Sequence, residues 1–109
     1  ILKHKDRNVI VFSGIADEES FVSMIKAEGL RIKETMKFSD HHNYTEADIE
    51  FLKKRHSGDE IFITTEKDFV KIRQFTEFNE NYPVYFLKMK AELYTDRDSM
   101  FSKLDEIIL

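Results

Sequence analysis

The sequence contains no cysteine, which excludes a disulfide framework and any metal site built from thiolates. With only three glycines and one proline, it has no flexible linker that could divide its 109 residues into two domains. The longest apolar runs, Val9–Phe12 and Val84–Leu87, have four residues each, whereas a membrane-spanning helix needs about 20. The first run ends too early, at Ser13-Gly14, to resemble a signal peptide. We expect a soluble chain in a reducing compartment.

The charge balance and the content of apolar residues further restrict which kinds of protein this chain can be. Lysine and arginine together number 17 against 21 aspartates and glutamates, and a net charge of −4 gives no electrostatic reason to expect a nucleic-acid partner. Hydrophobic residues make up 41% of the chain, which is enough to fill the core of one domain over residues 1–109. The chain begins with Ile1-Leu2-Lys3 and lacks an initiator methionine, so we expect it to be a piece of a longer protein.

Alternating strand and helix patterns predict an α/β fold. Segments rich in β-branched and aromatic residues predict four strands: Asn8–Phe12, Leu30–Phe38, Glu60–Thr64 and Pro83–Leu87. Helices are predicted over Asp17–Glu28, from the cap residue Thr45 to Ser57-Gly58, over Thr65–Gln74, and after Asp96. Only the second strand alternates apolar and charged residues, so we expect it at an edge. The predicted sheet is small, open, mostly parallel and Rossmann-like, with strand order 2-1-3-4 and helices on both faces.

Three polar segments follow the predicted strands, at the edge where parallel strands end. Ser13–Ala16 follows the first strand, Ser39–Tyr44 the second, and Thr64–Asp68 the third. Because ligands of open α/β sheets bind at this edge, we expect the three segments to converge. The turn at Gly14 leads into a helix and either cradles a phosphate or supplies only a tight turn. The P-loop motif G-x-x-x-x-G-K-[ST] does not occur in the chain.

The adjacent residues Asp40, His41 and His42 offer the most chemistry in these segments. Two imidazoles beside a carboxylate can bind a metal or orient a proton transfer, or they can be solvated groups of a loop that Asp40 anchors. An Asp-His-His triplet also occurs in manganese-dependent phosphoesterases, where carboxylates from other strand ends complete the site. Ser13 and Thr65 occupy those strand ends here, so we expect no metal site.

Lys67 is expected in the first turn of a helix, where its positive charge opposes the helix dipole. This position suggests an anionic partner, although the pair Lys67 and Lys71 is also typical of a solvated helix face. Elsewhere, His56 is predicted at the surface. Three aromatic residues follow no clear pattern and are interpreted as contacts with a neighbour outside the chain: Phe75, Phe78 and Tyr82.

Together, the three segments resemble the C-terminal part of the tetraacyldisaccharide 4'-kinase family, the lipid A 4'-kinases of Gram-negative bacteria. The family pattern runs G-I-A-x-P-x-x-F, then F-P-D-H-H-x-Y, then T-x-K-D-A-V-K, and the resemblance covers about residues 9–88. Glu18, Ser39 and Phe69 depart from it, at helix-start or packing positions. The family's P-loop, metal-binding carboxylates and membrane-associating segment lie upstream of the matching part.

The resemblance implies an enzyme that transfers the γ-phosphoryl group of ATP, with Mg²⁺, to the 4'-hydroxyl of the lipid A disaccharide precursor. His41 is the implied catalytic residue, acting with a carboxylate from the upstream domain, and Asp40 is implied to fix the loop or to touch the substrate or the metal's surroundings. Four further residues are expected to line the cleft or to contact the substrate: Gly14, His42, Tyr44 and Lys67.

The resemblance also implies that an N-terminal domain of the same chain binds most of the ATP and Mg²⁺, so that residues 1–109 alone bind neither and are inactive. The intact enzyme is expected at the cytoplasmic face of the bacterial inner membrane, held there by segments outside this chain. Two alternatives stay open from the residues themselves. One is a small metal-dependent phosphoesterase that uses Asp40, His41 and His42, and the other is a non-catalytic α/β interaction module.

Overall fold

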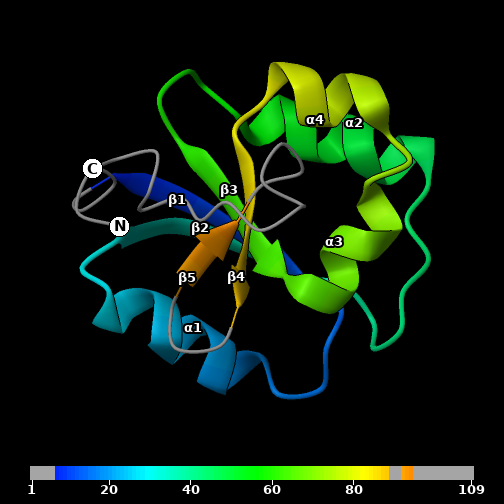
Figure 1. Ribbon diagram of the computed structural model, residues 1–109. Coiled ribbons are helices and arrows are strands. Elements are labelled where there is room, and N and C mark those ends of the chain that lie inside the picture. Colours follow the sequence, from blue (N-terminus) through cyan, green and yellow to red (C-terminus); the bar gives the residue numbers. More distant parts are fainter. Residues whose placement is uncertain (1–6, 89–91, 95–109) are drawn as a thin grey trace.

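A five-stranded sheet forms the centre of the molecule, and helices pack on both of its faces (Figure 1). The computed structural model describes residues 7–88 and 92–94. The strands are β1 (Asn8–Ser13), β2 (Arg31–Lys37), β3 (Ile61–Thr65), β4 (Val84–Lys88) and β5 (Glu92–Tyr94). The helices are α1 (Glu18–Ala27), α2 (Glu46–Arg55), α3 (Glu66–Ile72) and α4 (Thr76–Asn81).

The strands follow the order β2-β1-β3-β4-β5 across the sheet. β1 pairs in parallel with both β2 and β3, and β3 pairs in parallel with β4, which confirms the predicted order 2-1-3-4. β5 runs antiparallel to β4 and adds a strand that the sequence patterns did not predict. β2 lies at the edge, and its exposed and covered residues alternate as expected for a half-exposed strand. The helix predicted after Asp96 lies outside the described residues.

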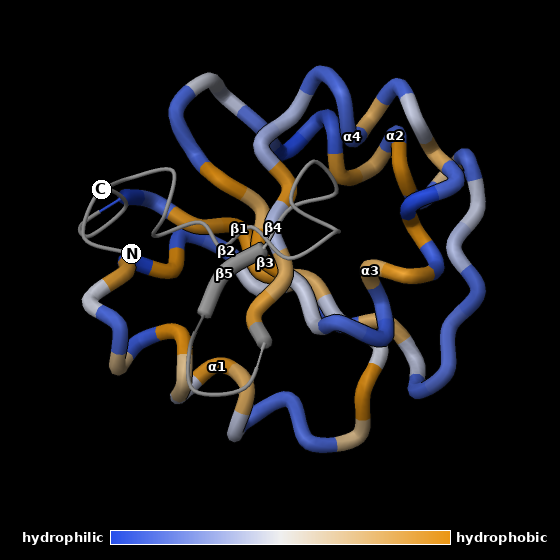
Figure 2. Tube along the Cα trace, viewed as in Figure 1, coloured by the Kyte–Doolittle hydropathy of each residue, from blue (hydrophilic) through white to orange (hydrophobic). Residues whose placement is uncertain are grey.

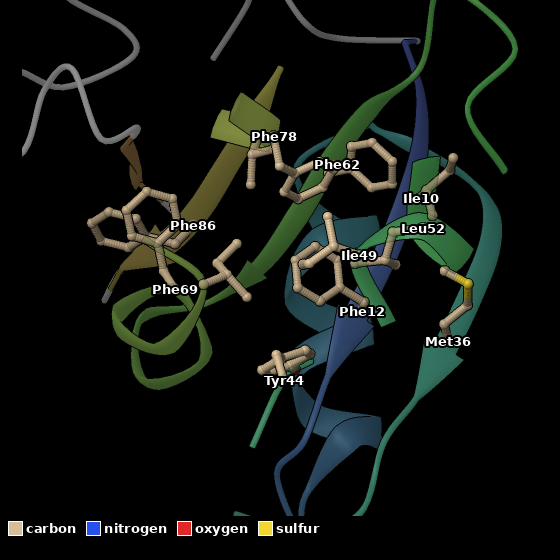
Figure 3. Packing of buried hydrophobic residues seen from close by; sticks show 12 residues of the cluster. Ile10, Phe12, Met36, Tyr44, Ile49, Leu52, Phe62, Phe69, Phe78 and Phe86 are labelled. Carbon is tan, nitrogen blue, oxygen red and sulfur yellow. The ribbon is translucent and has the colours of Figure 1, made fainter. Parts of the chain in front are cut away.

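The two faces of the sheet carry separate hydrophobic clusters because successive side chains of a strand point to opposite sides. One cluster packs α1 against the sheet through Phe21 and Ile25. The other packs α2, α3 and α4 against Phe12 and Phe62, whose ring centres lie 6.1 Å apart in an edge-to-face arrangement (Figure 3). Figure 2 shows hydrophobic residues along the central strands and hydrophilic residues over much of the surrounding helices and loops.

Polar side chains cap the first three helices at the predicted positions. Asp17 accepts a hydrogen bond from a first-turn amide of α1, and Thr45 and Asp48 form a reciprocal capping box on α2. Thr65 accepts a hydrogen bond from the Asp68 amide at 3.1 Å and so caps α3. Within residues 7–88 and 92–94, no helix has the length and apolar character that crossing a membrane requires.

α4 takes up residues that the sequence patterns left unassigned. α3 ends at Ile72, and the side-chain amide of Asn79 donates hydrogen bonds to the carbonyls of Ile72 and Phe75, at 2.9 and 3.0 Å. Phe78 is buried in the core, and Phe75 and Tyr82 pack against the same cluster. The interpretation of these three aromatic residues as contacts with an outside neighbour was therefore wrong. Their spacing places them on one helical face that the chain itself covers.

At the amino end of β3, buried Glu60 holds the turn that leads from α2 into the sheet. Its carboxylate accepts hydrogen bonds from the Ser57 and Gly58 amides, at 2.9 and 3.2 Å, and pairs with the Lys33 ammonium. Burial alone raises the pKa of Glu60, but the hydrogen bonds from Lys33 and Ser57 outweigh it and hold that pKa well below its ordinary value. The His56 ring donates to the Glu60 carbonyl at 2.8 Å and is only 13% exposed, so the prediction of a surface histidine was wrong.

Replacing Glu60 by glutamine is expected to lower the free energy of unfolding at pH 7 by about 1–3 kcal/mol, because the donors that face the carboxylate lose a charged acceptor. The pKa of this carboxyl is lower in the folded than in the unfolded chain. Its contribution to stability is therefore present above pH 4.5, the ordinary value, and is lost as the pH falls below it. Urea unfolding measured from pH 7 downwards tests both effects.

The matched control is Glu50→Gln, since Glu50 is an exposed carboxylate paired with Lys53 on the surface of α2. Exposed pairs contribute about 0–1 kcal/mol, so this variant should unfold much like the native chain. If stability falls as steeply with acid in Glu60→Gln as in the native chain, Glu60 is not the group responsible.

Candidate functional site

Three backbone segments meet at the carboxyl edge of the sheet. The loop of residues 39–44, which follows β2, is fastened to the turn after β1 because the His41 amide donates a hydrogen bond to the Gly14 carbonyl at 3.0 Å. α3 reaches the same edge directly from β3, and the Lys71 ammonium donates to the His42 carbonyl at 2.8 Å. Segments far apart in sequence therefore form one continuous surface at the end of the sheet.

Asp68, in the first turn of α3, joins all three segments through one buried carboxylate. It is 1% exposed, and the Gly14 amide donates to both of its oxygens at 3.1 Å. The Tyr44 hydroxyl donates to the same carboxylate at 2.9 Å, and the Thr65 hydroxyl donates to it as well. Burial and, after it, the negative charge of Asp68 raise the pKa of Tyr44 above its ordinary value of 10.0. The phenol therefore stays protonated and keeps its role as a donor.

Gly14 lies so close to the 39–44 loop that a side chain would not fit. A Cβ atom at this position would lie 2.7 Å from the Ser39 carbonyl oxygen and 3.2 Å from the His42 Cβ atom. Glycine is thus required by the approach of two backbones and not by a positive φ. Because its amide already donates to Asp68, the structure favours a packing role for this turn over a phosphate cradle.

His41 presents its imidazole at the open side of the loop. Its side chain is 81% exposed, and its φ of 61° lies in the left-handed region that few residues other than glycine adopt. Nε2 of His41 lies 3.7 Å from the Asp40 carboxylate, beyond hydrogen-bond distance but close enough for an ion pair whenever the imidazole is protonated. A substrate can reach this imidazole, and it has an acidic neighbour.

His42 has different surroundings and holds the loop. Its ring stacks on Phe38 with the ring centres 4.7 Å apart and meets Tyr44 edge to face at 4.9 Å. Its Nε2 lies 2.8 Å from the Asp48 carboxylate. Burial raises the pKa of Asp48, but the hydrogen bonds from His42 and Thr45 outweigh it, so that this pKa is lowered overall. Of the two adjacent imidazoles, one is accessible and the other is already engaged.

A cleft of about 570 Å³ opens between the three segments. Its lining comes from the turn after β1, the loop and one face of α3: Gly14, Ile15, Ala16, Asp40, His41, Lys67, Asp68, Val70 and Lys71. Four residues predicted for the site thus lie around one space: Gly14, Asp40, His41 and Lys67. The other two, His42 and Tyr44, are not part of the lining and pack behind the loop. The Lys67 ammonium makes no hydrogen bond or ion pair with the described part of the chain.

Sequence patterns did not single out Asp68 or Val70 as residues of this cleft, although Asp68 ends one of the three segments expected at this edge. Asp68 stands three residues after Thr65, a spacing that local patterns explain fully as a helix cap. Its other partners, Gly14 and Tyr44, are 54 and 24 residues away. The signal for Val70 was present but unused, since it is a large apolar side chain on a charged helix face and is 63% exposed.

The arrangement does not fit a resident divalent ion. Among residues 7–88 and 92–94, no group of three or more histidine, cysteine, aspartate or glutamate side chains is placed to hold one. A ring nitrogen of His42 is also taken up by Asp48, which leaves Asp40 and His41 without a third ligand from the triplet. The geometry therefore gives no support to the phosphoesterase alternative.

Comparison with known proteins gives a consistent set of relatives. Residues 2–109 match the family model described as Tetraacyldisaccharide-1-P 4'-kinase. The chain is 35% identical over 100 residues to the tetraacyldisaccharide 4'-kinase of Aquifex aeolicus, covering 92% of this chain and 27% of that protein. It is 31% identical over 101 residues to the enzyme of that name from Pelagibacter ubique, covering 92% of this chain and 31% of that protein.

A solved structure resembles this chain as well. It is the "apo" form of LpxK from Aquifex aeolicus in complex with ATP, with a TM-score of 0.55 and 30% sequence identity. The similarity covers 97% of this chain and 28% of that one. The chain thus spans less than a third of the length of the relatives it matches.

Proposed function

The chain belongs to the tetraacyldisaccharide-1-P 4'-kinase family, and from this premise we propose that it forms the C-terminal part of a lipid A 4'-kinase. The complete protein, meaning the gene product that contains this chain, would transfer the γ-phosphoryl group of ATP to the 4'-hydroxyl of a tetraacylated disaccharide 1-phosphate. The observation that carries the proposal is the family match over residues 2–109, nearly the whole chain. The acceptor would bind in the cleft between the three segments.

In this proposal His41 is the catalytic residue of the chain. Phosphoryl transfer requires the attacking hydroxyl to be positioned and its proton to be accepted, and an accessible imidazole suits that task near neutral pH. Together with a carboxylate from outside this chain, His41 would orient the 4'-hydroxyl and help to remove its proton. Asp40, whose carboxylate lies 3.7 Å from the His41 Nε2, would stabilise the imidazolium that forms. The exposed Lys67 ammonium would face an anionic group in the cleft.

In this proposal, ATP binds mainly to residues outside this chain. The sequence has no P-loop motif, and the described residues hold no cluster that fits a divalent ion. We therefore propose that ATP and Mg²⁺ bind mainly to an N-terminal domain and that catalysis takes place between that domain and this cleft. Mg²⁺ would supply charge neutralisation on the phosphates. The site of action we propose is the cytoplasmic face of the inner membrane, reached through segments outside this chain.

The test compares the complete protein with residues 1–109 alone, each incubated with Mg²⁺, radiolabelled ATP and the tetraacyldisaccharide 1-phosphate. We expect the complete protein to transfer label to the 4'-position and the isolated chain to transfer none. Circular dichroism of the isolated chain serves as the control that it is folded. Turnover by residues 1–109 alone would refute the two-part site, and stoichiometric manganese with phosphate release would replace the kinase by a phosphoesterase.

A further inference from the structure

Asp68 occupies the third position of α3, where a carboxylate ordinarily completes the helix cap. In α2 the corresponding residue does so, since the Asp48 carboxylate accepts a hydrogen bond from the Thr45 backbone amide at 2.9 Å. Asp68 keeps only half of this pattern. Its amide donates to the Thr65 hydroxyl at 3.1 Å, but its carboxylate is bonded to groups from two other segments of the chain. The helix cap therefore does not account for where this carboxylate lies.

The carboxylate is matched to the groups around it. Burying a charged carboxylate is costly unless its oxygens are hydrogen-bonded, and Asp68 is 1% exposed. Its neighbours are the Gly14 amide and the hydroxyls of Tyr44 and Thr65, and all three act as donors to it. An amide side chain in its place would offer one acceptor oxygen and turn its own N–H groups towards donors. The four acceptor positions of a carboxylate can serve all of these donors, whereas a neutral amide side chain cannot.

Two short routes, each made of hydrogen bonds, connect Asp68 to the loop that carries His41. On the first route, the Gly14 amide donates to Asp68, and the Gly14 carbonyl accepts the His41 amide at 3.0 Å. On the second, the Tyr44 hydroxyl fixes the far end of the same loop to Asp68. His41 has a φ of 61°, and such a backbone conformation persists only where the surroundings enforce it. Asp68 is the side chain common to both routes.

We infer that Asp68 is a positioning residue, which holds His41 at the cleft by fixing the 39–44 loop from both ends. The inference rests on the proposed function for the catalytic role of His41, but the hold on the loop is independent of it. Asp68 would act through Gly14 and Tyr44 and would not itself react. Its effect on the reaction would be on kcat, because a displaced imidazole leaves substrate binding largely intact and loses the alignment that the reaction needs.

The experiment removes one donor to Asp68 at a time in the complete protein. Tyr44→Phe deletes the hydroxyl and keeps the ring, so that the core stays filled. The matched control is Tyr82→Phe, which deletes a hydroxyl from a tyrosine packed against the same cluster but without a bond to Asp68. Asp68→Asn is the second variant and tests the carboxylate directly. Amide hydrogen exchange of residues 39–43 and steady-state kinetics are measured for each variant.

Tyr44→Phe is expected to lower kcat about 10-fold and Asp68→Asn about 100-fold, with KM for the disaccharide within about twofold of the native value. Hydrogen exchange of the amides of residues 39–43 should be faster in both of these variants. Tyr82→Phe should match the native protein in exchange and in kinetics. The double variant Tyr44→Phe with His41→Asn should be no slower than His41→Asn alone, because a loop without the imidazole has nothing left to position.

The outcomes separate this inference from the proposed function. If the native complete protein transfers no phosphoryl group, the proposed function fails, and amide hydrogen exchange alone tests the inference. Faster exchange of residues 39–43 in Tyr44→Phe then supports the hold on the loop. Unchanged exchange overturns it. If the native protein is active, an unchanged kcat in both single variants overturns the inference. Fully multiplicative effects of Tyr44→Phe and His41→Asn also overturn it, since they mean that the two residues act independently.

Discussion

Replacing His41 by asparagine is expected to lower the kcat of the complete protein by about 10²- to 10⁴-fold, the usual contribution of a general base. The change should leave the melting temperature nearly unaltered, because the His41 side chain is 81% exposed and packs against little. Asparagine is preferred to alanine here, since it tolerates the left-handed backbone conformation that His41 adopts. Steady-state kinetics with saturating ATP and thermal unfolding measure the two effects.

The neighbouring histidine provides the control for this substitution. His42 stacks on Phe38 and is bonded to Asp48, so His42→Asn should reduce the free energy of unfolding by about 1–2 kcal/mol. Its kcat should stay well above that of His41→Asn. The two adjacent histidines would then have different roles, with His41 affecting turnover and His42 affecting stability. Near-native turnover in His41→Asn would show that its imidazole takes no part in the reaction.

Replacing Gly14 by alanine is expected to lower kcat about 100-fold and the free energy of unfolding by about 1–3 kcal/mol. The added Cβ atom would lie 2.7 Å from the Ser39 carbonyl oxygen, which is backbone and cannot rotate away. Either the 39–44 loop moves outward or the Gly14 amide leaves Asp68, and both displace His41. Kinetics and urea unfolding of the complete protein test the two parts of this prediction.

Gly58→Ala is the matched control, a glycine-to-alanine change at the opposite edge of the sheet. A Cβ atom there meets nothing within 4 Å, but the φ of 147° is strained for any residue with a side chain. This variant should lose stability and keep its kcat per folded molecule. If Gly14→Ala also keeps its kcat, the contact between the turn after β1 and the 39–44 loop does not serve the reaction.

The sequence predicted the parallel part of the sheet because each of its strands carries its own local pattern of apolar residues. Val9–Phe12 is continuously apolar, as in a strand covered on both faces, and Leu30–Phe38 alternates, as at an edge. β5 and α4 were not predicted. β5 is only three residues long, too short for a periodic signal. α4 begins at Thr76, and its N-cap residue Phe75 forms no side-chain cap, so the usual marker of a helix start was missing.

The sequence indicated where the site lies but not what each of its residues does. Strand ends are easily placed, and so Gly14, Asp40, His41 and Lys67 were predicted at an edge where the structure has a cleft. The separate surroundings of His42 were not predictable, because the positive φ at His41 changes the course of the chain between the two residues. The bonds of Asp68 join segments whose approach depends on the packed sheet, and no local pattern encodes them.

The bond between Tyr44 and Asp68 also has a consequence for alkaline solutions. The pKa of Tyr44 is raised in the folded chain, so its contribution to stability is complete below pH 10.0 and declines as the pH rises beyond that value. A phenolate could not donate to Asp68, and the two negative charges would repel each other. Glu60, at the other end of β3, sets the corresponding limit in acid. Base therefore weakens the cleft end of the sheet through Tyr44, and acid weakens the opposite end through Glu60.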